Sequence, residues 1–521
     1  MNHIIVTARQ MRAIEGHMFA GGIPVAALME KVAGRIADWI VQQYPCLQFP
    51  HIGFLVGPGH NGGDALVVAR ELHHQGYQVQ VLYLTERRKD LTAAHGAYLN
   101  YLGVPTVSAL EDLQACDLIV DGGFGFGLER PLIGEIAQTL ATLNGWERPV
   151  ISIDLPSGLH TDTGASLGTA IQATHTLCLG LWKRGLFQDL ARAYRGEAHR
   201  IPFDIPESAI AAVLGPTPPL QQLTDETALA HLPLPRSATA HKYTAGHLLL
   251  IAGSHRYGGA ALLAGKGAIA SGVGMLTLVV PESLKAMVLG QLPEALVIGA
   301  EETEDGVIAA LPEDWQETNY DAIACGPGMT PAIGPVMTAI LKHTAPLLLD
   351  ADALNWVAIQ PALAGLANRA APTLLTPHLG EFRRLFPTAL DRTLDPIAAA
   401  QLAIQGTQTG LILKGANSTV TAPKGRQWIM ADSTPALARG GSGDVLTGLI
   451  GGLMAQQMKR PGQTPEQAML SAAISGVWWH GMTGRAIAHT HTELGCSPSQ
   501  LAAALPSALA PWISGEAISK P

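Results

Sequence analysis

The chain has 521 residues, of which 57 are glycine and 35 are proline; its composition is 47% hydrophobic and its formal net charge is −9. This length exceeds one ordinary hydrophobic core, so we expect two or more domains of a loop-rich α/β protein rather than a disordered chain. The negative charge comes without a basic block, which argues against nucleic acid and against an anionic membrane as partners.

The cysteines and the N-terminus bear on the compartment. The five cysteines are scattered without a CxxC pair, which argues against a disulfide framework and a zinc site and for a reducing compartment. The N-terminus lacks a basic segment followed by an apolar one, and no stretch approaches the ~20 apolar residues of a membrane span. We therefore expect a soluble cytoplasmic protein.

The first predicted unit is a βαβ element in HIGFLVGPGHNGGDALVVARELHHQGYQVQVLYL. A strand over about residues 52–56 precedes a glycine-rich turn, an amphipathic helix and a second strand. The turn matches G-x-G-x-x-G, and Glu86 lies near the end of the second strand; both features are typical of a dinucleotide site. His60, Asn61 and Asp64 crowd this turn, and a tight turn without chemistry is the alternative.

Further apolar strands are predicted in CDLIVDG, PVISIDLPSG and THTLCLG, which together indicate a parallel sheet covered on both faces. Because the carboxyl ends of parallel strands line one edge of the sheet, we expect the polar side chains that follow them to converge. They are Asn61, Asp121, Asp154 and Ser157. Oxygen-only groups at such an edge suit a hard cation, although each aspartate alone could simply cap a loop or a helix.

A proline-rich, irregular stretch over about residues 206–238 predicts a domain boundary. Beyond it, HLLLIAGS, a helix from Gly259 to Ser271 and MLTLVVP repeat the βαβ pattern. Later strands are predicted in DAIACGPGM, APLLLDADALN and PTLLTPHLGEF, and LILKGANSTVTAP is typical of a hairpin or of paired strands. We therefore expect two different α/β domains, residues 1–222 and 223–521.

The stretch GGSGDVLTG, residues 440–448, places glycines ahead of an apolar helix. Glycine lets backbone amides approach a ligand, and a helix start adds unpaired donors at the positive end of its dipole, so the stretch suits an anion. Asp444 would repel a phosphate that is only held, which favours a general base beside a reacting phosphate. The alternative is that Asp444 merely caps the helix. A near-Walker stretch, AGKGA, lacks the upstream glycine and the following Ser or Thr, which argues against a P-loop NTPase.

In the first half, GPGHNGGD, VDGGFGFGL and IDLPSG resemble the three motifs of the NAD(P)H-hydrate epimerases. The resemblance implies a Rossmann-like three-layer domain that acts on hydrated NAD(P)H, with Asp154 at the reacting carbon. It also implies a K⁺ ion held by Asn61, Asp121 and Ser157. The substrate contacts it implies are His60, Asn61, Gly62, Gly63, Asp64, Gly125, Phe126, Gly127, Leu128, Glu129, Arg130, Pro131 and Asp154. Three positions depart from the family's usual residues: His60, Ala65 and Phe126.

In the second half, HKYTAGHLLLIAGS, GPGM, DADALN, TPHLGE, KGANST and GGSGDVLTG resemble the ADP-dependent NAD(P)H-hydrate dehydratases, which have a ribokinase-like fold. Tyr243, Thr244 and Ala245 depart from the commonest form of the first motif. The resemblance implies ADP as co-substrate, Mg²⁺ in this domain and Asp444 as the catalytic base. The nucleotide contacts it implies are Lys414, Gly415, Ala416, Asn417, Ser418 and Gly443. The substrate contacts it implies are Ala261, Gly328, His378 and Asp444.

Together the two resemblances predict a bifunctional NAD(P)H-hydrate repair enzyme. Such an enzyme would interconvert the R and S hydrates of NADH or NADPH and dehydrate the S form with ADP, releasing AMP and phosphate. We also expect a homo-oligomer. Two other hypotheses are an ATP-dependent vitamin kinase fused to a Rossmann-like domain and a nucleotide-binding scaffold without catalysis. His378 could also only hydrogen-bond a loop, and DADALN could only cap its helix.

Overall fold

The computed structural model describes residues 3–359, 366, 369–393, 395–405, 407, 409–431 and 433–514. The chain divides into two compact units, Met1–Leu220 and Gln221–Pro521. All five cysteines are unpaired in the structure. Within the described residues we find no helix with the length and apolar character that crossing a bilayer requires.

The first unit is built on a seven-stranded parallel sheet with the order β4-β3-β2-β5-β6-β7-β9. Its strands are β2 (His51–Val56), β3 (Gln78–Tyr83), β4 (Thr106–Val107), β5 (Leu118–Gly122), β6 (Val150–Ile153), β7 (His175–Leu179) and β9 (Glu197–Ile201). The chain moves outward from β2 to β4 and then returns to the other side of β2. This reversal is the topological switch point at which open α/β sheets bind ligands.

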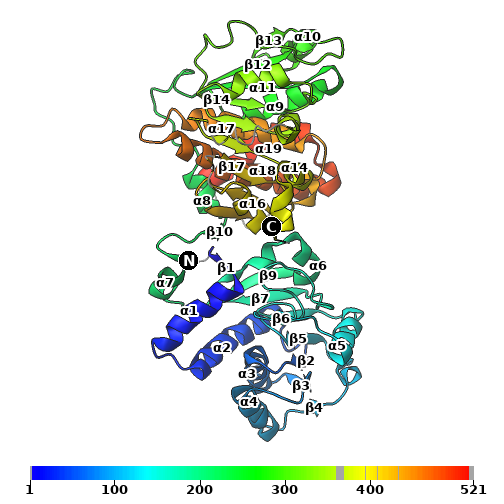
Figure 1. Cartoon of the computed structure of the whole chain (residues 1–521). Helices are drawn as coiled ribbons and strands as arrows, with labels where there is room; N and C mark the ends of the chain where they lie inside the picture. Colours follow the sequence, from blue (N-terminus) through cyan, green and yellow to red (C-terminus); the bar gives the residue numbers. More distant parts are fainter. Residues whose placement is uncertain are drawn as a thin grey trace. The chain divides into compact units, whose positions relative to one another are not determined.

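Helices cover both faces of this sheet, as Figure 1 shows. Alternation along β2 explains why: Phe54 faces a core that contains helix residues such as Ile36 and Leu66, whereas Leu55 faces a core that contains Leu140 and Leu143. The helices are α1 (Ala8–Ala20), α2 (Val25–Gln43), α3 (His60–His74), α4 (Asp90–Tyr101), α5 (Gly134–Asn144), α6 (Arg192–Arg195) and α7 (Glu207–Leu214). The predicted three-layer α/β fold is confirmed.

A separate two-stranded ladder fastens the N-terminus to the middle of the unit. Strand β1 (Ile5–Val6) pairs in parallel with β8 (Trp182–Lys183), and Val6 lies opposite Lys183. Helix α1 starts directly after β1, with Thr7 as N-cap in a reciprocal capping box with Gln10. The ladder therefore brings α1 beside the segment that follows β7.

The second unit contains a ten-stranded sheet with the order β10-β19-β18-β17-β16-β15-β14-β11-β12-β13. Pairing is parallel from β13 to β17 and antiparallel from β17 to β19. The strands are β10 (Leu220–Gln222), β11 (His247–Ile251), β12 (Met275–Pro281), β13 (Leu296–Ala300), β14 (Ala322–Cys325), β15 (Leu347–Leu349), β16 (Thr373–Leu375), β17 (Thr409–Leu413), β18 (Ser418–Thr421) and β19 (Gln427–Met430). The hairpin expected in LILKGANSTVTAP is the antiparallel β17–β18 pair, so that expectation is confirmed.

Two cores flank this sheet as well. Leu248 and Leu250 of β11 face the core that α9, α17, α18 and α19 share, and Leu249 and Ile251 face the core on the other side. The helices are α8 (Asp225–Ala230), α9 (Gly258–Ala270), α10 (Glu282–Gln291), α11 (Gly334–Leu341), α12 (Ala351–Ile359), α14 (Leu379–Leu385), α15 (Pro387–Asp391), α16 (Pro396–Ala403), α17 (Ser442–Gln457), α18 (Pro465–His491) and α19 (Pro498–Ser514). The α/β class predicted for the second half is confirmed, and α9 lies within one residue of the predicted helix.

Glycines let α17 lie directly against α9. A Cβ atom on Gly448 would lie 1.8 Å from the Ala264 carbonyl oxygen, and one on Gly267 would lie 2.2 Å from the Val445 carbonyl oxygen. No side chain fits at either position, so the two backbones are in contact. This packing fixes the position of the start of α17, where Asp444 lies.

We expect Gly448→Ala to lower the free energy of unfolding of the second unit by ~1–3 kcal/mol or more, because the added methyl overpacks the α9–α17 contact. Gly290→Ala is the matched control: this helical glycine has nothing within 4 Å of the added Cβ. Its replacement should be neutral or stabilising by up to ~1 kcal/mol. Chemical denaturation of the full chain measures both changes, and equal stability of the two variants would contradict the packing described.

Candidate active sites

A cavity of ≈ 1210 Å³ lies at the carboxyl edge of the first sheet, beside the switch point. Most of the predicted substrate contacts line it: His60, Asn61, Asp64, Gly125, Phe126, Gly127, Leu128, Glu129, Arg130, Pro131 and Asp154. Gly62 and Gly63 are buried within α3 and are not among the lining residues. Glu86 is exposed and does not line the cavity either, so the dinucleotide fingerprint lacks its usual acidic partner here.

The glycine-rich turn has a packing role that differs from glycine to glycine. A Cβ atom on Gly57 would lie 1.6 Å from the Gly123 carbonyl oxygen, and one on Gly62 would lie 2.1 Å from the Gly57 carbonyl oxygen. Gly59 has open space around it. Gly57 therefore allows the loop after β5 to approach the turn closely, and Gly62 allows the start of α3 to pack against Gly57.

Asp154 follows β6 directly and has left-handed backbone geometry, with φ of 67°. For a residue with a side chain this conformation is uncommon and marks a constrained position. The side chain accepts hydrogen bonds from the amides of Phe126 (2.9 Å) and Leu179 (3.3 Å). These contacts hold the two loops that flank the cavity, and the carboxylate still lies on the cavity lining.

The sequence analysis missed Lys183, whose ammonium group lies 2.5 Å from Asp154 Oδ1. Only 1% of the lysine side chain and 4% of the aspartate side chain are exposed, and the ammonium also donates to the Leu179 carbonyl oxygen. Burial acts to lower the pKa of Lys183, but the attraction and hydrogen bond to Asp154 together with the attraction to Cys178 and Glu15 outweigh burial, and the pKa lies above its usual value. The lysine therefore stays cationic at neutral pH.

Two further carboxyl groups face this ion pair. Burial raises the pKa of Glu15 to about 7, with repulsion from Asp154 acting in the same direction and attraction to Lys183 opposing it. Burial, together with repulsion from Asp154 and Glu15, holds the pKa of Asp64 well above its usual range. Both groups line the cavity, and Glu15, with its pKa of about 7, is poised to exchange a proton near neutral pH. No sequence motif marked Glu15; the β1–β8 ladder brings it here.

Asp121 and Ser157 form a buried network beneath the loop after β5. Asp121 accepts hydrogen bonds from the hydroxyls of Ser152 (2.7 Å) and Ser157 (2.5 Å) and from the amides of Ser157 and Gly123. Burial raises the pKa of Asp121 in spite of these hydrogen bonds. Among the described residues no lysine or arginine pairs with this carboxylate. Asp121 thus holds the loops together through hydrogen bonds, which agrees with the alternative that it caps a loop. It is also a buried carboxyl group.

Asn61 approaches the same loop from α3. A Cβ atom on Gly125 would lie 3.0 Å from Asn61 Oδ1 and 3.1 Å from Asp154 Oδ2, so these two side chains meet beside Gly125. The amide nitrogen of Asn61 is buried without a hydrogen-bond partner. The structure therefore brings together the four polar side chains that were expected to converge at this edge.

In the second unit, α17 begins at Ser442 after Gly441, which has φ of 97° and acts as N-cap without a side chain. Asp444 lies in the first turn, and in the part of the chain that the structure describes no hydrogen bond joins its carboxylate to a helix amide, so the capping alternative does not hold. The Ser442 amide donates to the Arg439 carbonyl oxygen. Within the described residues no acceptor lies opposite the Gly443 amide, which is therefore available to an anion.

A lysine–aspartate pair lies beside this helix start. Lys414, after β17, donates to Asp350 Oδ1 at 2.7 Å, and Thr447 of α17 donates to Asp350 Oδ2 at 2.7 Å. Burial raises the pKa of Asp444 to about 6; repulsion from Asp350 adds to this effect and attraction to Lys414 opposes it. Asp350, the first aspartate of DADALN, was assigned no role beyond capping, yet it connects the β17 turn to α17.

The other residues predicted for this unit lie at the same edge of the sheet. Gly328 has φ of 64° and packs against Tyr257 and Ala260, beside the buried Ala261 of α9. Gly415 and Ser418 form the β17–β18 turn and are joined by a hydrogen bond from the Ser418 hydroxyl. His378 caps α14, with Nδ1 accepting from the Gly380 and Glu381 amides. The imidazole of His378 therefore has a structural role at the start of α14, in line with the alternative that it only makes hydrogen bonds to a loop. Its contact with substrate stays a prediction.

Comparisons with known proteins cover both units. A family described as YjeF-related protein N-terminus matches residues 25–185, and a family described as NAD(P)H-hydrate dehydratase matches residues 248–507. A bifunctional NAD(P)H-hydrate repair enzyme of Thermosynechococcus vestitus is 50% identical over 96% of this chain and 96% of its own length. One from Synechocystis sp. is 48% identical over 98% of this chain and 95% of its own. The crystal structure of an ADP/ATP-dependent NAD(P)H-hydrate dehydratase from Bacillus subtilis, obtained with ATP/Mg²⁺, is 31% identical and covers 56% of this chain and 98% of its own, with a TM-score of 0.46.

We expect Lys183→Met to lower the free energy of unfolding of the first unit by ~3–5 kcal/mol at neutral pH, because Asp154 would be left as a buried charge without its cation. Asp204→Asn is the matched control: it removes a partner of Lys31 and Arg35 in an ion pair that is largely exposed. That change should leave stability nearly unaltered. Denaturant titration of the full chain compares the two, and an unaffected Lys183→Met protein would contradict the role of the pair.

Proposed function

The chain belongs to the bifunctional NAD(P)H-hydrate repair enzymes, which join an epimerase to a dehydratase, and we propose that Asp154 and Asp444 carry the two reactions. In this proposal residues 1–222 form the epimerase domain and residues 223–521 the dehydratase domain. The observation on which the proposal rests most is Asp444: a carboxyl group with a pKa of about 6 at the open start of a helix, beside Lys414 and Asp350.

The dehydratase reaction must remove a hydroxyl group from C6 of a saturated nicotinamide ring, and hydroxide is a poor leaving group. We propose that Asp444 takes the proton of this hydroxyl while its oxygen attacks the terminal phosphoryl group of ADP, so that AMP leaves. The C6–O bond then breaks with phosphate as the leaving group, assisted by the lone pair of the ring nitrogen, and loss of a proton from C5 to solvent forms the C5–C6 double bond, which yields NAD(P)H. The Gly443 amide and the Lys414 ammonium are placed to stabilise negative charge on the phosphoryl oxygens.

Several features support nucleotide binding at the same place. A Cβ atom on Gly443 would lie 3.4 Å from the Lys414 ammonium, so the helix start and the lysine face one space. The β17–β18 turn, residues 414–418, continues this edge. The carboxylates of Asp350 and Asp352 lie close enough to act on Asp444, and oxygen ligands of this kind fit Mg²⁺, which would neutralise phosphate charge when bound. ADP rather than ATP as the donor rests on the family resemblance.

The epimerase reaction must interconvert the R and S forms at C6, which needs a group that gives and takes a proton beside that carbon. Asp154 lies on the cavity lining, and its orientation is fixed by the amides of Phe126 and Leu179. Lys183 supplies a permanent positive charge that keeps the carboxylate in place. Glu15 and Asp64 line the same cavity, and burial raises the pKa of both carboxyl groups, which favours their protonated forms as hydrogen-bond donors to the substrate.

A K⁺ ion is proposed beneath the loop after β5, with Asn61, Asp121 and Ser157 as its ligands. The residues fit such an ion because they offer only oxygen ligands and because Asp121 is a buried carboxylate without a protein cation among the described residues. The ion would balance that charge and order the loop that carries Gly125–Pro131. A cytoplasmic location and a homo-oligomeric state remain predictions.

We expect Asp444→Asn to lower the dehydratase rate by ~10²–10⁴-fold, because the general base is lost. The same change should stabilise the nucleotide-free protein by about 1–3 kcal/mol at pH 8. Since burial raises the pKa of Asp444 from 3.8 to about 6, the wild type loses stability as pH rises through this range, and the gain from Asn should be smaller at pH 5 than at pH 8. Recovery of NADH absorbance from hydrated NADH and ADP measures the rate, and denaturation measures the stability.

Asp305→Asn is a suitable control, because Asp305 lies in an exposed turn of the same unit. It should change neither quantity. Near-wild-type turnover by Asp444→Asn would refute the base assignment. A stable phosphorylated product without recovery of absorbance would favour the vitamin kinase, and nucleotide binding without any turnover would favour the non-catalytic scaffold.

We expect Asp154→Asn in the full chain to leave a residual pool of the R hydrate after long incubation with ADP, because only the S form is consumed. Chromatographic separation of the two hydrates over time measures that pool. Dehydration of purified S hydrate should proceed at the wild-type rate, which serves as the internal control. Complete conversion of both hydrates at the wild-type rate would exclude Asp154 as the epimerase acid/base.

A further inference from the structure

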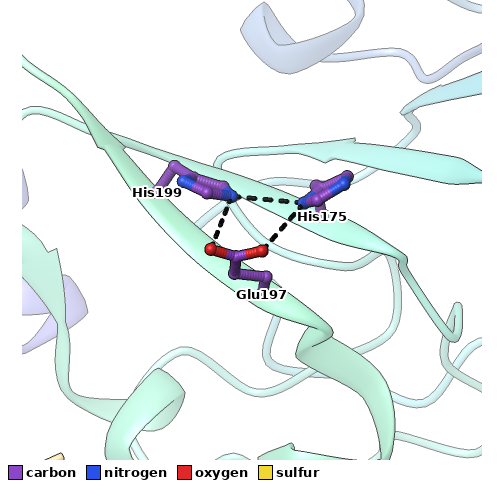
Figure 2. Close-up of side chains that lie close together, drawn as sticks. All are labelled: His175, Glu197 and His199. Carbon is purple, nitrogen blue, oxygen red and sulfur yellow. Dashed lines mark hydrogen bonds and ion pairs between the residues drawn. The ribbon is translucent and has the colours of Figure 1, made fainter. Parts of the chain in front are cut away.

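Three potential metal ligands meet at the opposite end of the first sheet, on neighbouring strands. His175 is the first residue of β7 and lies directly opposite Glu197, the first residue of β9. His199 lies two residues farther along β9, so all three side chains share one face of the sheet. Figure 2 shows that the two imidazoles and the carboxylate point toward one another.

The separations of the ligand atoms approach those of a metal site. His175 Nδ1 and His199 Nε2 are 3.2 Å apart, and they lie 3.9 Å and 3.7 Å from the carboxylate oxygens of Glu197. Two ligand atoms on a tetrahedral zinc ion lie roughly 3.3 Å apart, since Zn–N and Zn–O bonds are both ~2.0–2.1 Å. The imidazole pair already has this spacing. Glu197, whose side chain is 70% exposed, needs to move by only a few tenths of an ångström.

The surroundings hold both imidazoles in this arrangement. The ring of Trp39, on α2, packs against His175 and His199 with centroid distances of 5.2 Å and 5.0 Å. Gly196 fixes the start of β9: a Cβ atom there would lie 2.2 Å from the Thr174 carbonyl oxygen, and the Glu197 amide donates to that same oxygen. The strand register that brings the three ligands together is therefore set without a metal.

We propose that His175, Glu197 and His199 bind one divalent transition-metal ion, zinc above all, with water as the fourth ligand. Two imidazoles and one carboxylate are a ligand set that zinc uses in proteins, and K⁺ and Mg²⁺ prefer oxygen ligands alone. The absence of a CxxC pair argued against a zinc site built from cysteines. That argument does not apply to this cluster, because it contains no cysteine. None of the three residues lines the epimerase cavity, which lies at the carboxyl ends of the strands.

The site would join β9, the edge strand of the sheet, to β7. An edge strand has a partner strand, and therefore backbone hydrogen bonds to the sheet, on one side alone. Strand β9 is in addition followed by the segment that leads out of the unit. A metal ion that binds the folded form alone stabilises it in proportion to the logarithm of the metal concentration over Kd.

The competing explanation is a metal-free cluster in which one imidazole donates a hydrogen bond to the other. Untagged full-length protein, stripped with chelator, should take up one equivalent of Zn²⁺ with micromolar or tighter Kd in isothermal titration, and its Tm should rise with Zn²⁺. Glu197→Gln and His199→Gln should each raise Kd by at least ~10-fold and abolish the rise in Tm. His73→Gln and His74→Gln, on two adjacent histidines of α3, should change neither.

Co²⁺ provides a second measurement on the same proteins. The wild type should show the strong visible absorption of four-coordinate Co²⁺, and Glu197→Gln should lose it while keeping its metal-free epimerase rate. Absence of Zn²⁺ binding by the wild type would overturn the proposal. Equal Zn²⁺ affinity in the wild type and in both cluster variants would overturn it as well, because the ion would then bind elsewhere.

Discussion

In each unit, one ion pair between a lysine and a buried aspartate joins segments that lie far apart in the sequence. Lys183 meets Asp154 in the first unit, and Lys414 meets Asp350 in the second. Taking these charges out of water is costly, and only close geometry with added hydrogen bonds offsets that cost. The pairs are weak as sources of stability. What they supply is a fixed positive charge beside the carboxylate that does the proposed chemistry.

The acids around each fixed charge also lie in different environments. Around Lys183, Asp154 takes the ion pair and two amide donors, whereas burial and repulsion raise the pKa of Glu15 to about 7 and that of Asp64 well above its usual range. In the second unit Asp350 takes the lysine and the Thr447 hydroxyl, which leaves Asp444 with a pKa of about 6. Acids with the same side chain thereby acquire different roles.

The sequence predicted the site residues well where polar side chains come directly after an apolar strand. Apolar runs that ended in glycine and a carboxylate located β2, β5, β6 and α17, and the convergence of Asn61, Asp121, Asp154 and Ser157 followed from the geometry of parallel strands. Glu15, Lys183 and Asp350 were missed for a common reason. Glu15 reaches the cavity only through the β1–β8 ladder, and the partners of Lys183 and Asp350 are tertiary contacts. Such pairings leave no local pattern, so a single sequence cannot reveal them.

The two ends of the first sheet differ in the ligands they offer. At the carboxyl end, the proposed cation site offers carboxylate, hydroxyl and amide oxygens, with Lys183 and His60 elsewhere on the cavity lining; the amino end offers two imidazoles and a carboxylate. Zinc binds oxygen-only sites with less preference than sites that contain nitrogen, and a hard monovalent cation has the opposite preference. Since β7 and β9 are only five residues long, this difference in ligand type, rather than distance, would keep a transition metal away from the proposed cation site beside the epimerase cavity.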